Sequence, residues 1–536
     1  MSKTICKNCS AEVLDNMKFC STCGMPVEHP VLEEATPDVV KPVEKQPLGL
    51  DKFKKFIKPF IAVIAVIILV SLVWNIFKPS KYETYKGVVY LLQSDDQVVI
   101  KQNGKAKIVV DGFLDNQQTC LDGIKTAFLV QEEEGSNSND GYTLYLFDQS
   151  LKRVADSVFS FQLSSNGDTV AFTTEVYKGI GELCLYRKGI ISTIHSEFNA
   201  SNNFVISPDG STVAYSNIDE DDKLIGYYYD GKQKELGKDI IPIAVSNGAK
   251  YVYYSKNNKL YVQKGDKSDT KESLGDEFEI YAFNKDYSQA IYTSRSGNEI
   301  RTYLTRNGGE KERLSGNISE LLLPSFSSVQ YINNSFGNNF AFYRTIGVAS
   351  FADTYYYDGS SIYHIDKKFS TIRVTGNAQD AYLAADGKTI LFKRSDSIQK
   401  VDGSKEDAKL VKIVEKEVDS FIATEDSKAV YYLNTDDELY YQKGKGKPVT
   451  VSNDMSSDGY FGYCFTLIKG NQLYYVSDDE LYVSNGDKGT TVKGIDGDIM
   501  YVFANKYAVI IVAEDDGDSF TYWSEDGKKF ELVGSD

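Results

Sequence analysis

The sequence predicts an all-β protein made mainly of β-propeller repeats, preceded by a small metal-binding module and one membrane-spanning helix. Three observations carry this prediction. Alternating apolar segments separated by Asp-Gly and Asn-Gly turns recur through residues 82–536. Two Cys-x-x-Cys pairs lie near the N-terminus, and residues 60–77 form an apolar run that no charged residue interrupts.

The N-terminal module is expected over residues 1–28. Its four cysteines form two pairs with ten residues between the pairs. At this spacing, four thiolates can surround one zinc ion. So short a segment has few apolar residues, so bound metal must supply most of its folding free energy. We therefore expect structural Zn²⁺, without an open coordination position for catalysis, bound by Cys6, Cys9, Cys20 and Cys23.

Residues 4–27 resemble the short zinc-ribbon domains found at the N-termini of many bacterial membrane proteins. The resemblance implies a structural or interaction module with these four cysteines as ligands. A redox dithiol pair and two disulfides are the alternatives. A reducing cytoplasm and the doubled motif favour zinc over both.

Residues 29–56 are expected to be a proline-rich, charged linker. Five of the eleven prolines fall between Pro26 and Pro47, among acidic residues and lysines, and no apolar periodicity is present. Such a composition is typical of an extended spacer.

A transmembrane helix is predicted over residues 57–77. Its 18-residue apolar run would span about 27 Å as a helix, close to the thickness of a bilayer core. The alternative is a buried helix of a soluble protein, but a helix that is apolar on all sides needs a large helical core around it. Lysines are denser before the run, at positions 52, 54, 55 and 58, than after it, which predicts a cytoplasmic N-terminus and an extracellular C-terminal region.

Charge differs on the two sides of this helix. The whole chain carries −17, residues 1–81 carry +3, and the remaining 455 residues carry −20. An acidic exterior would repel phosphates, so we expect no nucleic-acid partner for the exterior part.

The repeats combine a polar turn with a strand and a hairpin, at intervals of about 40 residues, as four-stranded propeller blades do. The clearest copy is Ser207-Pro208-Asp209-Gly210 followed by an apolar strand to Tyr215. This copy resembles the propeller repeats of the Tol-system periplasmic protein and related WD-like families, a resemblance that concerns the fold and not the partner.

Eleven repeats are expected across residues 82–536. Since single propellers usually have four to eight blades, eleven suggests two rings or one large irregular ring, and wider spacing around Phe340 places a boundary near residue 325, between sets 82–325 and 326–536. The repeats are anchored near Val89, Ala127, Val170, Val213, Val252, Ile291, Phe340, Ile390, Val430, Leu473 and Val509.

Catalytic residues are not apparent. The exterior part has only His195 and His364 as histidines and no Gly-x-Ser-x-Gly motif. The acidic runs 219–222 and 514–518 could bind calcium, but they lack EF-hand spacing and fit solvated loops better. Cys120, Cys184 and Cys464 are interpreted as small apolar strand residues.

The predicted function is that of a single-pass, non-enzymatic binding or scaffold protein of the cell envelope. Its extracellular propeller would recognise a protein, a peptide or a wall component, and its zinc ribbon would contact a cytoplasmic protein. The alternatives are a hydrolase or lyase acting on a cell-wall polymer at a propeller centre, and a purely structural spacer. No ligand-binding residue can be named from the sequence.

Overall fold

The computed structural model describes a ring of β-sheets and one small N-terminal hairpin. The described residues are 3–5, 12–14, 88–94, 96–102, 105–132, 141–199, 202–265, 271–323, 331–336, 340–406, 408–424, 426–455, 465–468, 472–477, 480–504 and 508–535. The chain divides into two compact units, Met1–Lys78 and Pro79–Asp536.

In the first unit, β1 (Lys3–Ile5) pairs antiparallel with β2 (Glu12–Leu14). The four predicted zinc ligands, the linker 29–56 and the predicted membrane helix 57–77 lie outside the described residues. Within the described ranges, no helix has the length and apolar character needed to cross a membrane.

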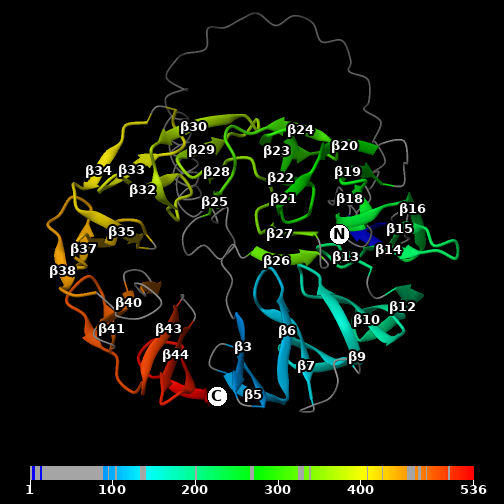
Figure 1. The fold of residues 1–536 in the computed structure, drawn as a ribbon, viewed down its shortest axis with the longest axis horizontal. Coiled ribbons are helices and arrows are strands. Elements are labelled where there is room, and N and C mark those ends of the chain that lie inside the picture. Colours follow the sequence, from blue (N-terminus) through cyan, green and yellow to red (C-terminus); the bar gives the residue numbers. More distant parts are fainter. Residues whose placement is uncertain are drawn as a thin grey trace, which may run out of the picture. The chain divides into compact units, whose positions relative to one another are not determined.

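In the described residues the second unit consists of ten β-sheets (Figure 1). We number them from 1 to 11 in chain order, because the seven-stranded sheet is counted as two repeats, sheets 2 and 3. Apart from one inserted hairpin, neighbouring strands within each sheet are antiparallel and follow one another in chain order, as in propeller blades. Sheets 1 to 5 contain β3 (Val89–Ser94), β4 (Gln97–Gln102) and β5 (Lys105–Asp111); β6 (Phe113–Thr119), β7 (Lys125–Gln131), β8 (Tyr142–Asp148) and β9 (Leu151–Leu163); β9 again with β10 (Thr169–Tyr177), β11 (Ile180–Arg187) and β12 (Ile190–Asn199); β13 (Phe204–Ile206), β14 (Val213–Ile218), β15 (Leu224–Tyr229) and β16 (Gln233–Lys238); and β17 (Ile241–Val245), β18 (Tyr251–Lys256), β19 (Lys259–Lys264) and β20 (Lys271–Asp276).

Sheets 6 to 11 continue the same order. They contain β21 (Phe278–Phe283), β22 (Gln289–Ser296), β23 (Glu299–Arg306) and β24 (Glu310–Arg313); β25 (Glu320–Leu322), β28 (Thr354–Tyr357), β29 (Ser361–Ile365) and β30 (Thr371–Gly376); β31 (Gln379–Leu383), β32 (Thr389–Arg394), β33 (Ser397–Asp402) and β34 (Val411–Val414); β35 (Val418–Ala423), β36 (Ala429–Asn434), β37 (Leu439–Lys443) and β38 (Val449–Ser452); β39 (Phe465–Ile468), β40 (Gln472–Ser477), β41 (Glu480–Ser484) and β42 (Thr490–Thr491); and β43 (Asp498–Ala504), β44 (Val509–Asp515), β45 (Asp518–Ser524) and β46 (Glu531–Ser535).

The long strand β9 joins sheets 2 and 3 into one seven-stranded sheet, because its first half pairs with β8 and its second half with β10. The one helical element in the described part of the chain is the 3-10 turn η1 (Asn247–Ala249). An all-β fold of propeller repeats, as predicted, is thus confirmed for this unit.

Sheets 11 and 1 close the ring. The Lys101 Nζ atom lies 2.9 Å from Glu531 Oε2, and the rings of Tyr90 and Trp523 meet edge to face with centroids 4.9 Å apart. Val99 and Val533 are buried in the same contact. Figure 1 shows this junction between β3 and the C-terminus, so the eleven sheets follow one another around a single ring.

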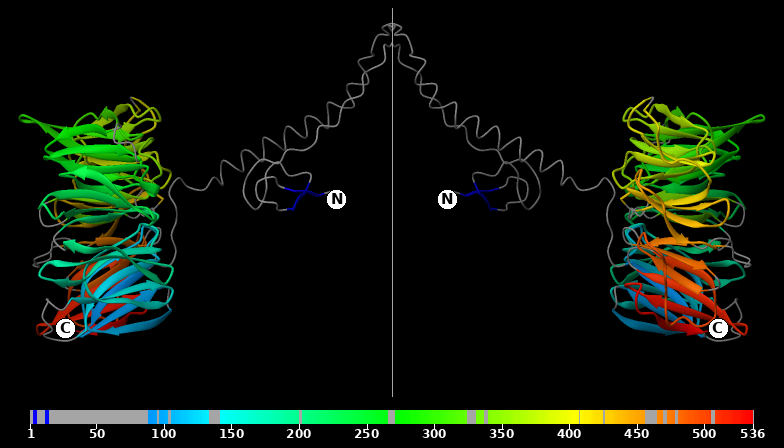
Figure 2. Two further views of the ribbon diagram at one scale, coloured as in Figure 1. Left: turned by 90° about the vertical axis from the view of Figure 1, so that its right-hand side faces the viewer. Right: turned by 90° about the vertical axis from the view of Figure 1, so that its left-hand side faces the viewer.

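Each sheet runs between two faces of the ring (Figure 2). Because neighbouring strands are antiparallel, the turns after the first and third strands of the four-stranded repeats lie on one face, which we call the first face. The turn after the second strand and the connection to the next sheet lie on the opposite, second face. The first strands, such as β21, lie nearest the ring centre (Figure 1).

The predicted polar turns occur between the first two strands and have a common hydrogen-bond pattern. In the clearest copy, the Ser207 hydroxyl donates to Asp209 Oδ1 (2.8 Å) and accepts from the Thr212 N–H (2.9 Å). Gly210 has a φ of 71°, which glycine adopts without strain. Seven sheets begin this turn with an equivalent residue: Cys120, Ser164, Ser207, Ser246, Asn284, Ala384 and Thr424.

Directly opposed tyrosines fill much of the core. Tyr254 and Tyr261, for example, stack at 5.5 Å between the second and third strands of sheet 5. The same pairing recurs in Tyr292–Tyr303, Tyr356–Tyr363, Tyr432–Tyr440 and Tyr475–Tyr482. Cross-strand packing therefore accounts for these tyrosines, as β-propensity suggests.

The predicted repeat at Phe340 is wrong, because Phe340 begins β27 (Phe340–Ile346), which belongs to an inserted hairpin with β26 (Tyr331–Phe336). The hairpin pairs in parallel with β21 and is drawn inside the ring (Figure 1). The seventh sheet instead has β28 as its second strand. This insertion explains the widened repeat spacing, and the expected boundary near residue 325 falls between β25 and β28, which are paired in one sheet.

Candidate functional site

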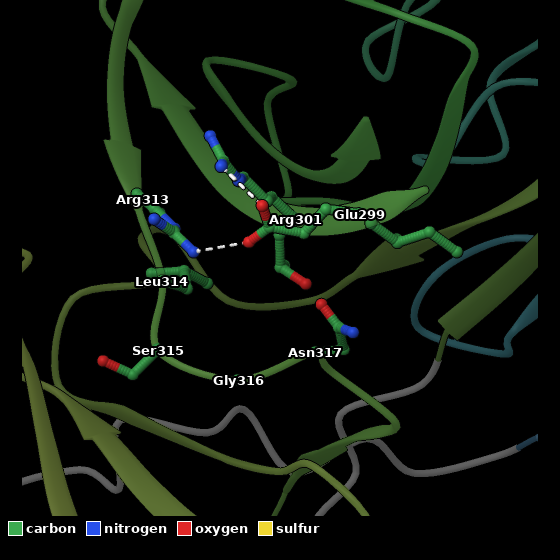
Figure 3. A pocket seen from close by; sticks show the side chains of 9 residues that line it. Glu299, Arg301, Arg313, Leu314, Ser315, Gly316 and Asn317 are labelled. Carbon is green, nitrogen blue, oxygen red and sulfur yellow. Dashed lines mark hydrogen bonds and ion pairs between the residues drawn. The ribbon is translucent and has the colours of Figure 1, made fainter. Parts of the chain in front are cut away.

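A polar pocket of about 630 Å³ opens on the second face of sheet 6. It lies where β23 begins and where β24 leads into the connection to sheet 7 (Figure 3). Glu299, Arg301, Arg313 and Asn317 contribute its chemistry, and Leu314 and Gly316 line it beside them.

One carboxylate and two guanidinium groups form the charged centre of this pocket. The Glu299 carboxylate lies 2.5 Å from Arg301 Nη2 and 3.3 Å from Arg313 Nη2, and Figure 3 shows the two arginines approaching it from different sides. The hydrogen bond from Arg301 lowers the pKa of Glu299, and the Glu299 carboxylate raises the pKa of Arg301. The centre therefore keeps one net positive charge.

Strand pairing places these groups together. Residues 299, 301 and 303 share one side of β23, and Arg313 lies directly opposite Tyr303 on β24. Arg313 is therefore a diagonal neighbour of Arg301, and its long side chain extends along β23 to Glu299.

The connection after β24 is held by hydrogen bonds. Thr302 accepts the Leu314 N–H at its carbonyl (3.0 Å) and the Ile318 N–H at its hydroxyl (3.2 Å), and Tyr356 donates to the Ser315 carbonyl (2.5 Å). A side chain at Gly316 would place Cβ 2.6 Å from Asp358 Oδ2, and its φ is 68°. Glycine is therefore required here, and the loop has a defined shape.

This arrangement suits recognition of a negatively charged group. A guanidinium donates two parallel hydrogen bonds to a carboxylate, and here two guanidinium groups face only one internal carboxylate. General acid catalysis would need a carboxyl group with a raised pKa, whereas that of Glu299 is lowered.

The two exterior histidines lie elsewhere. His195 on β12 accepts a hydrogen bond at Nε2 from Asn217 Nδ2 (2.8 Å), and its Nδ1 atom lies 3.4 Å from the Tyr215 hydroxyl oxygen. Burial lowers the pKa of His195. His364 is buried, and its Nε2 atom lies 3.0 Å from Asp353 Oδ1. Neither lines the pocket of sheet 6.

The other residues considered from the sequence have structural surroundings. Asp219 accepts the N–H groups of Asp221 and Lys223, so this acidic run forms a turn, and the described residues contain no group of three or more potential metal ligands. Cys184 is a buried strand residue, as predicted. The interpretation of Cys120 as a strand residue is wrong, because it begins the turn before β7, where its thiol donates to Asp122 Oδ1 (2.8 Å).

Sequence reasoning missed the arginines of this pocket. Glu299-x-Arg301 shows an alternation that puts both side chains on one side of a strand, but only the pairing of β23 with β24 brings Arg313, twelve residues later, to the same carboxylate. Cys464 and the four N-terminal cysteines lie outside the described residues.

Comparison with known proteins agrees with the N-terminal prediction. Residues 5–27 match the zinc-ribbon domain family. A search of curated proteins finds no significant match to the chain.

Several solved structures resemble the chain weakly. The tricorn protease shares 13% identity with a TM-score of 0.30, covering 84% of this chain and 58% of its own. TolB from Acinetobacter baumannii shares 14% with a TM-score of 0.28, covering 52% and 70%. A eukaryotic initiation factor shares 10% with a TM-score of 0.37, covering 69% and 97%.

Proposed function

We propose that this protein is a non-enzymatic, membrane-anchored binding protein of the cell envelope. Its ring lies outside the cell and binds a carboxylate-bearing group of a protein, peptide or wall polymer at the Arg301–Arg313 pocket. The helix 57–77 anchors it, and the zinc ribbon, with Zn²⁺ held by Cys6, Cys9, Cys20 and Cys23, contacts a cytoplasmic protein.

The observation that carries this proposal is the excess of guanidinium over carboxylate in a pocket of fixed shape. Arg301 and Arg313 share Glu299, so an incoming carboxylate can replace part of that contact without leaving a charge unpaired. Because the rest of the ring is acidic, such a ligand is recognised locally and not by the overall field.

The pKa directions favour a binder over the hydrolase or lyase alternative. Burial opposes ionisation of Asp386, but hydrogen bonds from the N–H groups of Thr389 and Lys388 outweigh it and lower its pKa. The pKa of Asp402 is lowered by a hydrogen bond from Ser404. All described carboxyl groups with a clearly shifted pKa are shifted downward, as for Glu299, opposite to the direction that a general acid needs.

A peptide-binding measurement on the full-length protein tests the pocket. The probe is a short peptide with a C-terminal carboxylate, and its amidated form is the matched control. Arg301→Gln and Arg313→Gln should each weaken carboxylate binding about tenfold, whereas Arg295→Gln, on the same sheet but outside the pocket, should change it less than about twofold. Equal affinity for the amidated peptide would refute the proposal.

The N-terminal part of the proposal has two separate tests. Purified protein should contain one zinc ion per chain, and Cys20→Ser should lose it, as measured by elemental analysis. Protease added to intact cells should digest the ring and spare the ribbon; the opposite pattern would reverse the orientation.

A further inference from the structure

A second pocket, of about 300 Å³, lies between sheets 8 and 9 on the first face of the ring. Leu391, Lys400 and Ile413 line it from sheet 8, and residues 427–430, Lys443 and Gly444 line it from sheet 9. Three lysines therefore border one small space in a chain whose net charge is −17.

Lys400 occupies a position that is apolar in the other comparable sheets. The residue seven positions after the start of each polar turn lies on the second strand. Its directly opposed partner faces the neighbouring sheet. In six sheets this partner is apolar and at most 8% exposed: Leu146, Leu185, Tyr228, Val262, Leu304 and Tyr441. In sheet 8 the partner of Leu391 is Lys400, which is exposed.

This substitution leaves open a space that is filled elsewhere. Between sheets 4 and 5, Tyr228 is 1% exposed and packs in the core with Leu236 and Val252. Between sheets 8 and 9, Leu391, Ile413 and Val430 are equally buried, but the flexible Lys400 side chain stands at the pocket instead of an aromatic ring.

The charges in this pocket are only partly neutralised within the chain. Lys428 pairs with Asp426 at 3.1 Å. Lys400 and Lys443 form no ion pair with any described residue. Two ammonium groups are thus available to a ligand, and the third can be shared with one.

Hydrogen bonds hold the residues around this pocket in place, and the Ser427 hydroxyl offers a further donor. Gln442 Nε2 donates to the Ile413 carbonyl (2.6 Å), which ties sheet 9 to sheet 8, and the Gly444 N–H donates to the Lys428 carbonyl (2.9 Å). The Ser427 Oγ atom is buried and has no hydrogen-bond partner in the described residues. A buried hydroxyl without a partner is unfavourable unless a ligand or water satisfies it.

We propose that this pocket binds a phosphate group carried on a sugar or polyol, either as a small molecule or as a unit of a polymer. Lysines bind phosphate as compact point charges, and three of them can surround its oxygens. The volume exceeds that of a phosphate ion, and the apolar floor of Leu391, Ile413 and Val430 accepts the carbon part of the ligand. This site is distinct from the Arg301–Arg313 pocket and does not depend on its function.

Titration calorimetry of the full-length protein with inorganic phosphate, glycerol phosphate and glycerol tests the proposal. Glycerol phosphate should bind more tightly than inorganic phosphate, glycerol should not bind, and added salt should weaken binding. Lys400→Met and Lys443→Met should each weaken glycerol phosphate binding about tenfold or more. A poly(glycerol phosphate) chain then separates the two sources, since only a polymer-binding site gains affinity with chain length.

Lys264→Met is the matched control. Lys264 ends the third strand of sheet 5 as Lys443 ends that of sheet 9, and the Gly265 N–H bonds to the Lys250 carbonyl (3.0 Å) as Gly444 does to Lys428. This variant removes the same charge and should change affinity less than about twofold. An equal loss in Lys264→Met, or no saturable binding of glycerol phosphate, would overturn the proposal.

Discussion

The junction between sheets 4 and 5 and that between sheets 8 and 9 share one backbone pattern but differ in a side chain that faces the neighbouring sheet, Tyr228 in the first and Lys400 in the second. Tyr228 fills the first with a buried ring, whereas Lys400 leaves the second as an open, basic pocket. Both residues lie opposite the residue seven positions after the start of the polar turn.

The difference shows how a repeated fold can contain a binding site without a new element. Ring stability is distributed over eleven inter-sheet contacts, so one junction can lose an apolar side chain while its neighbours keep theirs. At sheets 8 and 9, Gln442 still links the two sheets through the Ile413 carbonyl. A site of this kind is thus a local change in side chains on a retained backbone.

Emptying the filled junction should have the largest effect. Tyr228→Ala removes a side chain that is 1% exposed and leaves a cavity between sheets 4 and 5. We expect a loss of about 3–5 kcal/mol in the free energy of unfolding, measured by urea denaturation. Tyr228→Phe is the control and should lie within about 1 kcal/mol of the wild type, because the Tyr228 hydroxyl has no partner among the described residues. A small loss for Tyr228→Ala would mean that the junction collapses to fill the space.

Filling the open junction should have a smaller and opposite effect. Lys400→Leu introduces the residue type found at this position in sheets 2, 3 and 6, next to the buried Leu391 and Val430. We expect a gain of about 1–2 kcal/mol in the free energy of unfolding, because a Leu side chain is buried where an ammonium group was solvated. Destabilisation in the same urea measurement would contradict the equivalence of the two junctions.

The polar turn that begins at Cys120 provides the third comparison. Its thiol occupies the place of the Ser207 hydroxyl. Burial, and to a smaller extent the hydrogen bond to Asp122, raises the pKa of Cys120 to about 12. The thiolate is therefore scarce at neutral pH, and folded protein should react with iodoacetamide at Cys120 at least about tenfold more slowly than unfolded protein. Peptide mass spectrometry measures this; rapid labelling of the folded chain would show that the turn opens.

The smallest expected effect is the pH dependence at the junction of sheets 3 and 4. There His195 contacts Asn217 and the Tyr215 hydroxyl, with Tyr227 beside it and Glu197 nearby. Burial lowers the folded-state pKa of His195, so the unfolded chain takes up the proton first as the pH falls below about 6.5, and stability decreases until the folded-state pKa is passed.

His195→Gln isolates this contribution. Its amide can still bond to Asn217 but does not titrate, so its stability should fall less than that of the wild type between about pH 7.5 and about pH 5. Parallel curves for the two proteins in urea titrations would exclude His195 as a source of the pH dependence.

Local patterns in the sequence predicted most of the architecture. Ten of the eleven predicted anchor residues lie on strands of separate repeats. The turn at Ser207 and its variants could be predicted because short-range hydrogen bonds hold them, between residues that are close together in the sequence. The failure at Phe340 has a physical cause: the inserted hairpin has the same strand-like composition as a repeat, and only its pairing with β21 distinguishes it.

The repeating strands, their turns and the N-terminal zinc-ribbon motif could be predicted from the amino-acid sequence, since each depends on residues close together in the chain. The closure of sheet 11 on sheet 1 depends on tertiary contacts, and so does the placing of Arg301 with Arg313 in one pocket and of Lys400 with Lys443 in another. These contacts depend on strand register and on which sheets become neighbours, and a side chain gives no local signal of the residue that will face it across such a junction.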